Sequence, residues 1–271
     1  MQQLLPASGP VFSYYRPSAG LAPYVAYYSV QHRFAAFASP QFLPELGGSL
    51  ILSWAAGGGQ SMVWGPFTIV TTTGPQPPGL CARCFVEFRP GGLARLLYGD
   101  ASALRNTKVP LEQMNPVLAR ALYALLEQHL DGTGGIRGLL RGLDDCLLRE
   151  LCLRRGAQPP AWQTLQLLQG YGVGQSAGAL AGMAHYSPRQ VSRQVNALCG
   201  VTPKEYLRIK RVKQAADLLK STPAPLEELA LRLHYYDTAH FVHDFQCVLG
   251  VPPTGYRQNM STFYNEKLGC L

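Results

Sequence analysis

One short segment of the sequence carries polar side chains at helical spacing. In SPRQVSRQVNALCG, which starts at Ser187, four polar residues fall at i, i+3, i+4 and i+7 and share one helix face: Arg189, Ser192, Arg193 and Asn196. Arginine can donate two hydrogen bonds to guanine in the major groove of DNA, and asparagine suits adenine. The face therefore predicts base reading, and the alternative is an ordinary solvated surface.

The residues around this face indicate how a fold would hold it. Ser187 can cap a helix, and Pro188 fits the first helical position. Val191, Val195 and Leu198 fall on the opposite face, where they would pack on a preceding helix. We therefore expect the polar face to lie at the surface of a small helical unit.

The same unit occurs twice in the chain. SPRQVSRQVNALCGVTPKEYL aligns with DTAHFVHDFQCVLGVPPTGYR, from Asp237, at a constant offset of 50 residues. Four residue types are identical in both copies: Gly200/Gly250, Val201/Val251, Pro203/Pro253 and Tyr206/Tyr256. Each copy predicts a short helix, a turn and a longer helix, so the chain repeats one supersecondary unit.

Positive charge is concentrated in the first copy and in the helix that follows it. The 271-residue chain has a net charge of +8, and residues 187–220 carry eight Lys and Arg against two carboxylates, a net +6. Residues 221–260 carry a net −2. The first unit could therefore neutralise DNA phosphates. The basic residues expected to contact phosphates, or to add to the positive field there, are Lys204, Arg208, Lys210, Arg211 and Lys213.

Both copies together resemble a known family. HYSPRQVSRQVNALCGVTPKEYLRIKRVKQAADLL and LRLHYYDTAHFVHDFQCVLGVPPTGYRQ are similar to the two halves of an AraC/XylS-type DNA-binding domain, over about residues 165–258. The resemblance implies an all-α domain of about seven helices with two helix-turn-helix units, whose third and sixth helices enter adjacent major grooves. It places the base-reading positions on Arg189, Ser192 and Arg193 in the first half, and on Thr238, Ala239, Val242 and His243 in the second.

The chain departs from the family pattern at two places. The family usually has glycine in the turn before each reading helix, and this chain has His185 and His234 there. Histidine accepts a positive φ better than most non-glycine residues, so we expect the fold to be kept at a small stability cost. The second reading face lacks the frequent arginine of the family and should contribute less affinity. If charged His243 helps to bind DNA, affinity should rise as pH falls from ~8 to ~6.

Residues 1–115 predict a strand-rich domain. Short apolar runs such as 49–54, 62–70 and 80–88 are separated by glycine and proline, which is typical of a sheet sandwich or small barrel. VEFRPGGLARLLYG, followed by VPLEQM, resembles the sensor-type domain that precedes such DNA-binding domains, over about residues 11–115. That resemblance implies a cupin-like β-domain used for effector binding, dimerisation or both, and the sequence does not identify an effector.

Residues 116–155 change to a helical period. A helix is expected from Pro116 and another after DGTGG, and we predict that Leu140, Leu143 and Leu147 hold a homodimer. The sequence thus predicts an α+β two-domain fold. Its parts are a sensor or dimerisation domain (1–115), a helical connector (116–155), a linker (156–160), the DNA-binding domain (161–260) and a tail (261–271).

Enzyme and metal chemistry fit the sequence poorly. The first 160 residues hold only His32 and His129, so a metal-dependent cupin enzyme is not expected. Cys81 and Cys84 form a single pair, which we assign to packing rather than to zinc or redox chemistry. No phosphate-binding glycine loop or Ser/His/Asp signature occurs. We therefore expect no enzymatic activity, no metal and no cofactor.

The sequence predicts a cytoplasmic, sequence-specific transcriptional regulator. No apolar run approaches the ~18 residues of a membrane span, and the seven scattered cysteines favour reduced thiols. Double-stranded DNA is the expected partner, with RNA polymerase and a small-molecule effector as further candidates. The alternative is a protein-interaction adaptor that uses the leucine faces of residues 116–155 and does not bind DNA.

Overall fold

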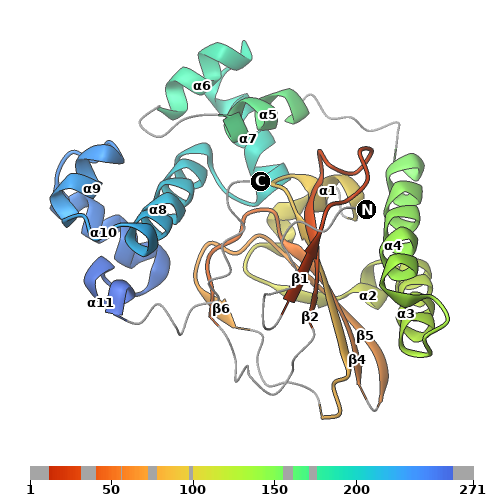
Figure 1. The fold of residues 1–271 in the computed structure, drawn as a ribbon. Coiled ribbons are helices and arrows are strands. Elements are labelled where there is room, and N and C mark those ends of the chain that lie inside the picture. Colours follow the sequence, from red (N-terminus) through yellow and green to blue (C-terminus); the bar gives the residue numbers. More distant parts are fainter. Residues whose placement is uncertain are drawn as a thin grey trace.

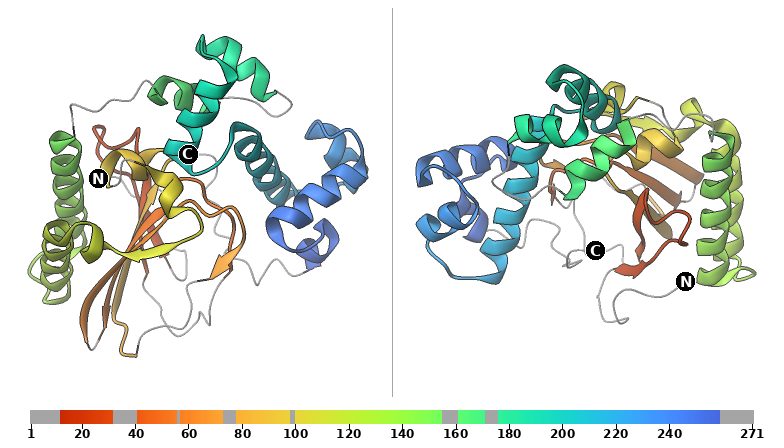
Figure 2. Two further views of the ribbon diagram at one scale, coloured as in Figure 1. Left: turned by 180° about the vertical axis from the view of Figure 1, so that it is seen from behind. Right: turned by 90° about the horizontal axis from the view of Figure 1, so that it is seen from above.

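The computed structural model describes residues 12–31, 41–55, 57–72, 78–97, 100–154, 161–170 and 176–258. An antiparallel sheet with flanking helices forms the amino-terminal domain, and helices alone form the carboxyl-terminal domain (Figures 1 and 2). The predicted α+β two-domain fold is confirmed at this level. The predicted linker at 156–160 and the tail at 261–271 lie outside the described residues.

The main sheet has six antiparallel strands. Their spatial order is β1 (Phe12–Tyr15), β2 (Val25–Gln31), β7 (Ala82–Phe88), β4 (Ser49–Ala55), β5 (Gly58–Trp64) and β8 (Lys108–Pro110). A separate two-stranded sheet pairs β3 (Gln41–Phe42) with β6 (Thr71–Thr72). The strand expected over 62–70 ends at Trp64, because Gly65 approaches the backbone of Leu104 closely and Pro66 has no N–H for a ladder.

Side chains of the central strands alternate between two cores. Leu50 and Leu52 of β4 and Val86 of β7 belong to one buried cluster, whereas Ile51 and Phe85 belong to another. The alternation follows from the two-residue repeat of a strand. The first cluster is covered by helices, and the second is mainly aromatic and faces the carboxyl-terminal domain through the pocket described below.

Two long helices cover the first face of the sheet: α3 (Pro116–Leu130) and α4 (Gly135–Leu153) (Figure 1). Asn115 caps α3, since its side chain accepts a hydrogen bond from Leu118 N at 3.0 Å. Leu140, Leu143 and Leu147 are at most 2% exposed and lie in the amino-terminal core. The prediction that these three leucines hold a dimer is wrong, because the chain's own sheet and α3 already cover them.

Three short helical segments complete the amino-terminal domain: α1 (Gly92–Leu96), η1 (Ala101–Leu104) and α2 (Leu111–Met114). None of the helices within the described ranges is long and apolar enough to cross a membrane. In the same part of the chain, no group of three or more His, Cys, Asp and Glu side chains is placed to hold a metal ion.

Seven helices build the carboxyl-terminal domain within the described residues. They are α5 (Ala161–Gly170), α6 (Ala177–Ala184), α7 (Pro188–Cys199), α8 (Pro203–Ser221), α9 (Leu226–Arg232), α10 (Thr238–Leu249) and α11 (Pro253–Gln258). Helix α8 lies between the group α5–α7 and the group α9–α11 (Figures 1 and 2). The repeated apolar positions form the core, since Val195 and Phe245 are buried at equivalent places, as are Tyr206 and Tyr256.

Candidate nucleic-acid interface and interdomain pocket

The turns before α7 and α10 have the same geometry. His185 and His234 adopt φ values of 55° and 57°, which confirms the positive φ considered for these positions. The next residue in each turn donates back across it, Tyr186 N to Ala181 O at 3.2 Å and Tyr235 N to Ala230 O at 2.9 Å. These are the hydrogen bonds of a Schellman-type helix end. The two helix pairs are therefore built alike despite little identity between their reading faces.

Helix α7 is fixed at its start and packed along its back. Ser187 and Gln190 form a capping box, with Gln190 N donating to Ser187 Oγ at 3.3 Å and Ser187 N donating to Gln190 Oε1 at 3.0 Å. Val191 and Val195 are at most 1% exposed. This packing fixes the rotation of the helix, so its polar face points away from the core.

The structure brings the predicted reading residues of α7 together. Arg189 and Arg193 are exposed, and Ser192 and Asn196 are half-buried. All four line one open groove of about 560 Å³, together with Ser187, Gln190 and Thr202. Two guanidinium groups, an amide and hydroxyls thus face solvent from one surface, which is the set of donors and acceptors that base edges require.

Helix α10 presents a less polar face. Its cap is Asp237, whose Oδ1 accepts from His240 N at 2.7 Å. Ala239 and His243 are exposed, while Thr238 and Val242 are half-buried. The turn before α10 holds an exposed aromatic residue that the sequence analysis did not single out, Tyr236 at 94% exposure. Its neighbour Tyr235 is buried.

The basic residues of α8 have different surroundings. Lys204 is exposed and Arg208 is half-buried. Lys210 Nζ donates to Gln169 O at 2.7 Å, and burial lowers the pKa of this lysine. The Arg211 guanidinium lies 4.8 Å from the ring centre of Tyr235. Among the five basic α8 residues expected to contact phosphates or to add to the positive field, Lys210 and Arg211 therefore have side chains that hold the helices of the domain together.

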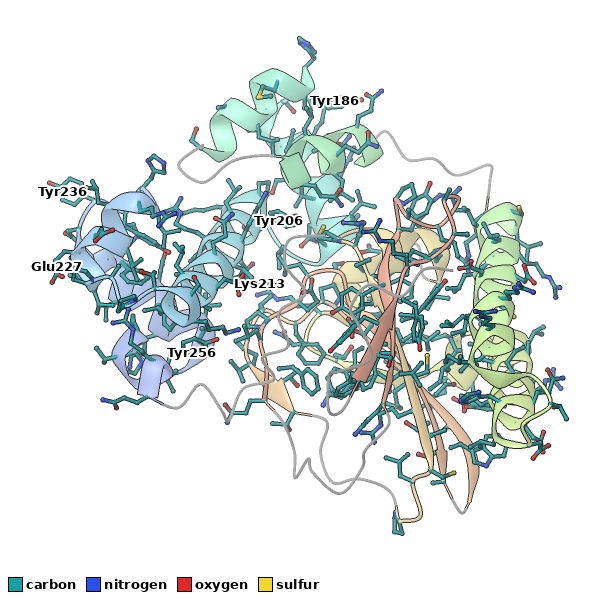
Figure 3. The ribbon with its side chains drawn as sticks, viewed as in Figure 1. Tyr186, Tyr206, Lys213, Glu227, Tyr236 and Tyr256 are labelled. Atoms are coloured by element: carbon teal, nitrogen blue, oxygen red, sulfur yellow. The ribbon has the colours of Figure 1, made fainter. Side chains whose placement is uncertain are left out.

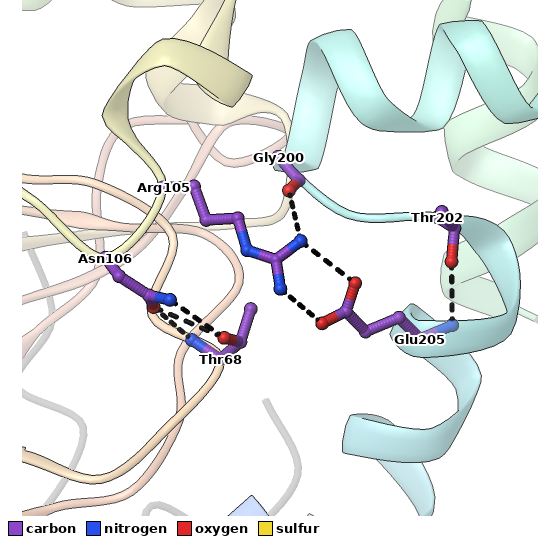
Figure 4. A network of polar contacts seen from close by, with 6 residues as sticks. All are labelled: Thr68, Arg105, Asn106, Gly200, Thr202 and Glu205. Carbon is purple, nitrogen blue, oxygen red and sulfur yellow. Dashed lines mark hydrogen bonds and ion pairs between the residues drawn. The ribbon is translucent and has the colours of Figure 1, made fainter.

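A salt bridge joins the two domains next to α7. Arg105 Nη2 donates to Glu205 Oε1 at 2.6 Å, and Arg105 Nη1 donates to Glu205 Oε2 at 3.1 Å and to Gly200 O at 3.4 Å (Figure 4). Glu205 N donates to Thr202 Oγ1 at 3.2 Å, which caps α8. The turn between α7 and α8 is thus attached to the sheet domain through a bidentate arginine. Sequence reasoning missed this contact because its partners lie 100 residues apart.

A second contact between the domains borders a pocket. Lys213 of α8 forms an ion pair with Glu45, and Figure 3 shows Lys213 between α8 and the sheet domain. The pocket beside this pair has a volume of about 280 Å³. Glu87 of β7 lines it, and the pKa of this carboxyl group is raised to about 7. Burial is the main cause and the charge of Glu45 adds to it, whereas the hydrogen bond from Ser49 and the charge of Lys213 oppose the rise.

Comparison with known proteins gives a family for the carboxyl-terminal domain. Residues 180–259 match the family described as a helix-turn-helix domain. The HTH-type transcriptional activator RhaS of Salmonella arizonae is 26% identical over 159 residues, which cover 59% of this chain and 48% of that protein. RhaS of Salmonella paratyphi B is 25% identical over 159 residues. The chain spans about half the length of these curated relatives.

Some solved structures are similar to part of the chain, and others are similar to most of it. The C-terminal domain of AraT, a response regulator from Geobacillus stearothermophilus, is 26% identical, with a TM-score of 0.35. The matched region covers 42% of this chain and 94% of the AraT domain. ToxT from Vibrio cholerae O395 is 10% identical, with a TM-score of 0.45, and the matched region covers 88% of this chain and 98% of the ToxT chain. The predicted resemblance to AraC/XylS-type regulators is confirmed by the family match and the RhaS relatives.

Proposed function

We propose that this protein is a sequence-specific DNA-binding transcriptional regulator of the AraC/XylS type. The observation that carries the proposal is the duplicated helix pair: two turns of identical geometry each present a capped helix whose apolar back is buried. A helix held in this way can enter the major groove of double-stranded DNA. Helices α7 and α10 would read adjacent grooves, as the sequence resemblance implies.

The two reading helices would contribute unequally. Helix α7 offers Arg189 and Arg193, and each good bidentate pair with guanine is worth about 1–3 kcal/mol of discrimination. Helix α10 offers His243 and small or apolar side chains, which suit thymine methyl groups better than guanine. Lys204, which is exposed on α8, would contact a phosphate and fix the register.

The amino-terminal domain would act as a cupin-like sensor. The pocket of about 280 Å³ between its aromatic sheet face and α8 supports effector binding, because a ligand there touches both domains. A homodimer and contact with RNA polymerase remain predictions from the sequence. The adaptor alternative is less favoured, because the leucine face on which it depends is buried in the chain's own core.

Salt dependence of DNA binding tests the proposed function. Genomic DNA fragments that the purified protein retains on a filter are first isolated. The protein is then titrated into labelled duplexes of these fragments and of random sequence, and binding is followed by fluorescence anisotropy at 50–200 mM salt. With about four phosphates contacted, affinity should fall roughly 100-fold over this range, because displaced counterions drive association. An adaptor that does not bind DNA would show no saturable binding at 50 mM salt, and this result would remove the proposal.

A further inference from the structure

The pocket between the domains has an aromatic wall on the sheet side and a charged wall on the helix side. The sheet side is formed mainly by six rings, Phe12, Tyr14, Tyr27, Trp64, Phe67 and Phe85, with Phe42 at the short second sheet. Lys213, Asp217 and Lys220 line the pocket from α8. Most of these rings are less than a tenth exposed, so the wall is packed and preformed.

Two of the three carboxyl groups that line the pocket have a lysine partner. Lys213 is paired with Glu45, and Lys220 Nζ lies 3.8 Å from Asp217 Oδ1. Glu87 is the third carboxyl group of the lining, and within the part of the chain that the structure describes it forms no ion pair with a lysine or arginine. Its Oε2 accepts a hydrogen bond from Ser49 Oγ at 2.5 Å, which holds the group in place. Among the described lining residues, Glu87 is therefore the carboxyl group that forms no ion pair.

The aromatic wall is also suited to a cation. The negative face of an aromatic ring attracts an ammonium group within about 6 Å of its centre. Lys108 Nζ already lies 4.1 Å from the ring centre of Trp64 and 5.9 Å from that of Phe67. A ligand ammonium beside Glu87 would meet a carboxyl group in a pocket that aromatic rings also line, and the rings would contact the apolar body of the ligand. An anionic ligand would meet repulsion from the carboxyl groups unless an existing ion pair first opened.

We propose that this pocket binds a small organic cation, a protonated amine on a compact apolar body, with its ammonium group against Glu87. The ligand would also compete with Lys213 for Glu45, so its binding would loosen the attachment of α8 to the sheet domain. Only this second effect rests on the proposed DNA-binding function, because α8 supports both reading helices. The binding itself does not depend on that function.

A matched set of probes tests the ligand class on the full chain without DNA. The probes are 2-phenylethylamine, the neutral 2-phenylethanol and the anionic 3-phenylpropanoate, titrated at pH 7.5 and followed by tryptophan fluorescence, which Trp64 in the pocket wall should report. The amine should bind saturably and at least tenfold more tightly than the alcohol or the acid. Equal affinity for all three, tighter binding of the acid, or no binding of the amine would overturn the proposal.

Variants separate the site from the rest of the surface. Glu87→Gln should weaken amine binding at least tenfold, whereas Glu127→Gln, which removes an exposed carboxylate on α3, should leave it unchanged. Ser49→Ala is a second test that keeps the carboxyl group, and it should weaken binding by a smaller factor because Glu87 loses its hydrogen bond. Unchanged amine affinity in Glu87→Gln would contradict the assignment even if DNA binding were intact.

Discussion

Replacement of Glu87 by glutamine should change how stability depends on pH. In the folded protein, burial raises the pKa of this carboxyl group from 4.5 to about 7, whereas in the unfolded chain it ionises near its ordinary value. Between these two pH values the folded state keeps a proton that the unfolded state has lost. The free energy of unfolding of the wild type must therefore fall as pH rises through this window, and glutamine, which does not ionise, removes this contribution.

The size of the effect follows from the two pKa values. The difference between the folded and unfolded pKa values corresponds to at most about 3 kcal/mol of unfolding free energy, at about 1.4 kcal/mol for each pKa unit. Solvent in the open pocket screens the charge and reduces this contribution. We expect the stability of Glu87→Gln relative to wild type to increase by about 1–3 kcal/mol as the pH rises from 5 to 8. Urea unfolding followed by tryptophan fluorescence measures this, because two of the three tryptophans, Trp54 and Trp64, lie in the sheet domain.

An exposed carboxylate provides the control for this measurement of stability against pH. Glu127→Gln, with its exposed carboxylate on α3, should follow the wild-type pH profile. If wild type and Glu87→Gln give parallel stability curves from pH 5 to pH 8, the carboxyl group is not buried as the structure has it.

Three further changes test the fold and the DNA-binding surface. His234→Val should lower the free energy of unfolding by about 1–2 kcal/mol in urea melts, and His234→Gly should not lower it, because φ there is 57°; a tolerated valine would contradict this turn. Lys204→Ala should reduce the salt slope of DNA binding by about 1, whereas Lys210→Ala should leave the slope unchanged, because its ammonium group contacts Gln169 O. Gly65→Ala should destabilise the sheet domain by about 2 kcal/mol or more in thermal unfolding, because the added Cβ would lie 1.7 Å from Leu104 O; full stability would show that the contact relaxes.

Local sequence patterns predicted much of the carboxyl-terminal domain. The repeat placed α7 and α10 at equivalent positions, and Ser187 and Pro188 indicated where α7 begins. The departure from glycine pointed to the strained turns at His185 and His234. These features depend on residues within a few positions of one another, where capping, helical period and allowed φ values act directly.

Features that depend on distant residues were not predictable in this way. The leucine period of residues 135–153 indicates an apolar helix face but not which surface covers it, and the face assigned to a dimer proved to be part of the core. The basic residues of α8 share a similar ambiguity, because sequence alone does not distinguish a solvated lysine from Lys210, which contacts α5. The bridges from Arg105 to Glu205 and from Lys213 to Glu45 join separate domains.

Replacement of Arg193 by alanine tests the central claim most directly. The affinity of the Arg193→Ala variant for a genomic fragment that the wild type retains, and for random duplex, is compared with that of the wild type. Arg137 is an exposed arginine on α4, and Arg137→Ala serves as the matched control. We predict that Arg193→Ala loses about 1–3 kcal/mol on the specific site, relaxes preference at one base pair and changes random-duplex binding little. An equal loss on both duplexes, or no loss on either, would contradict base reading by α7.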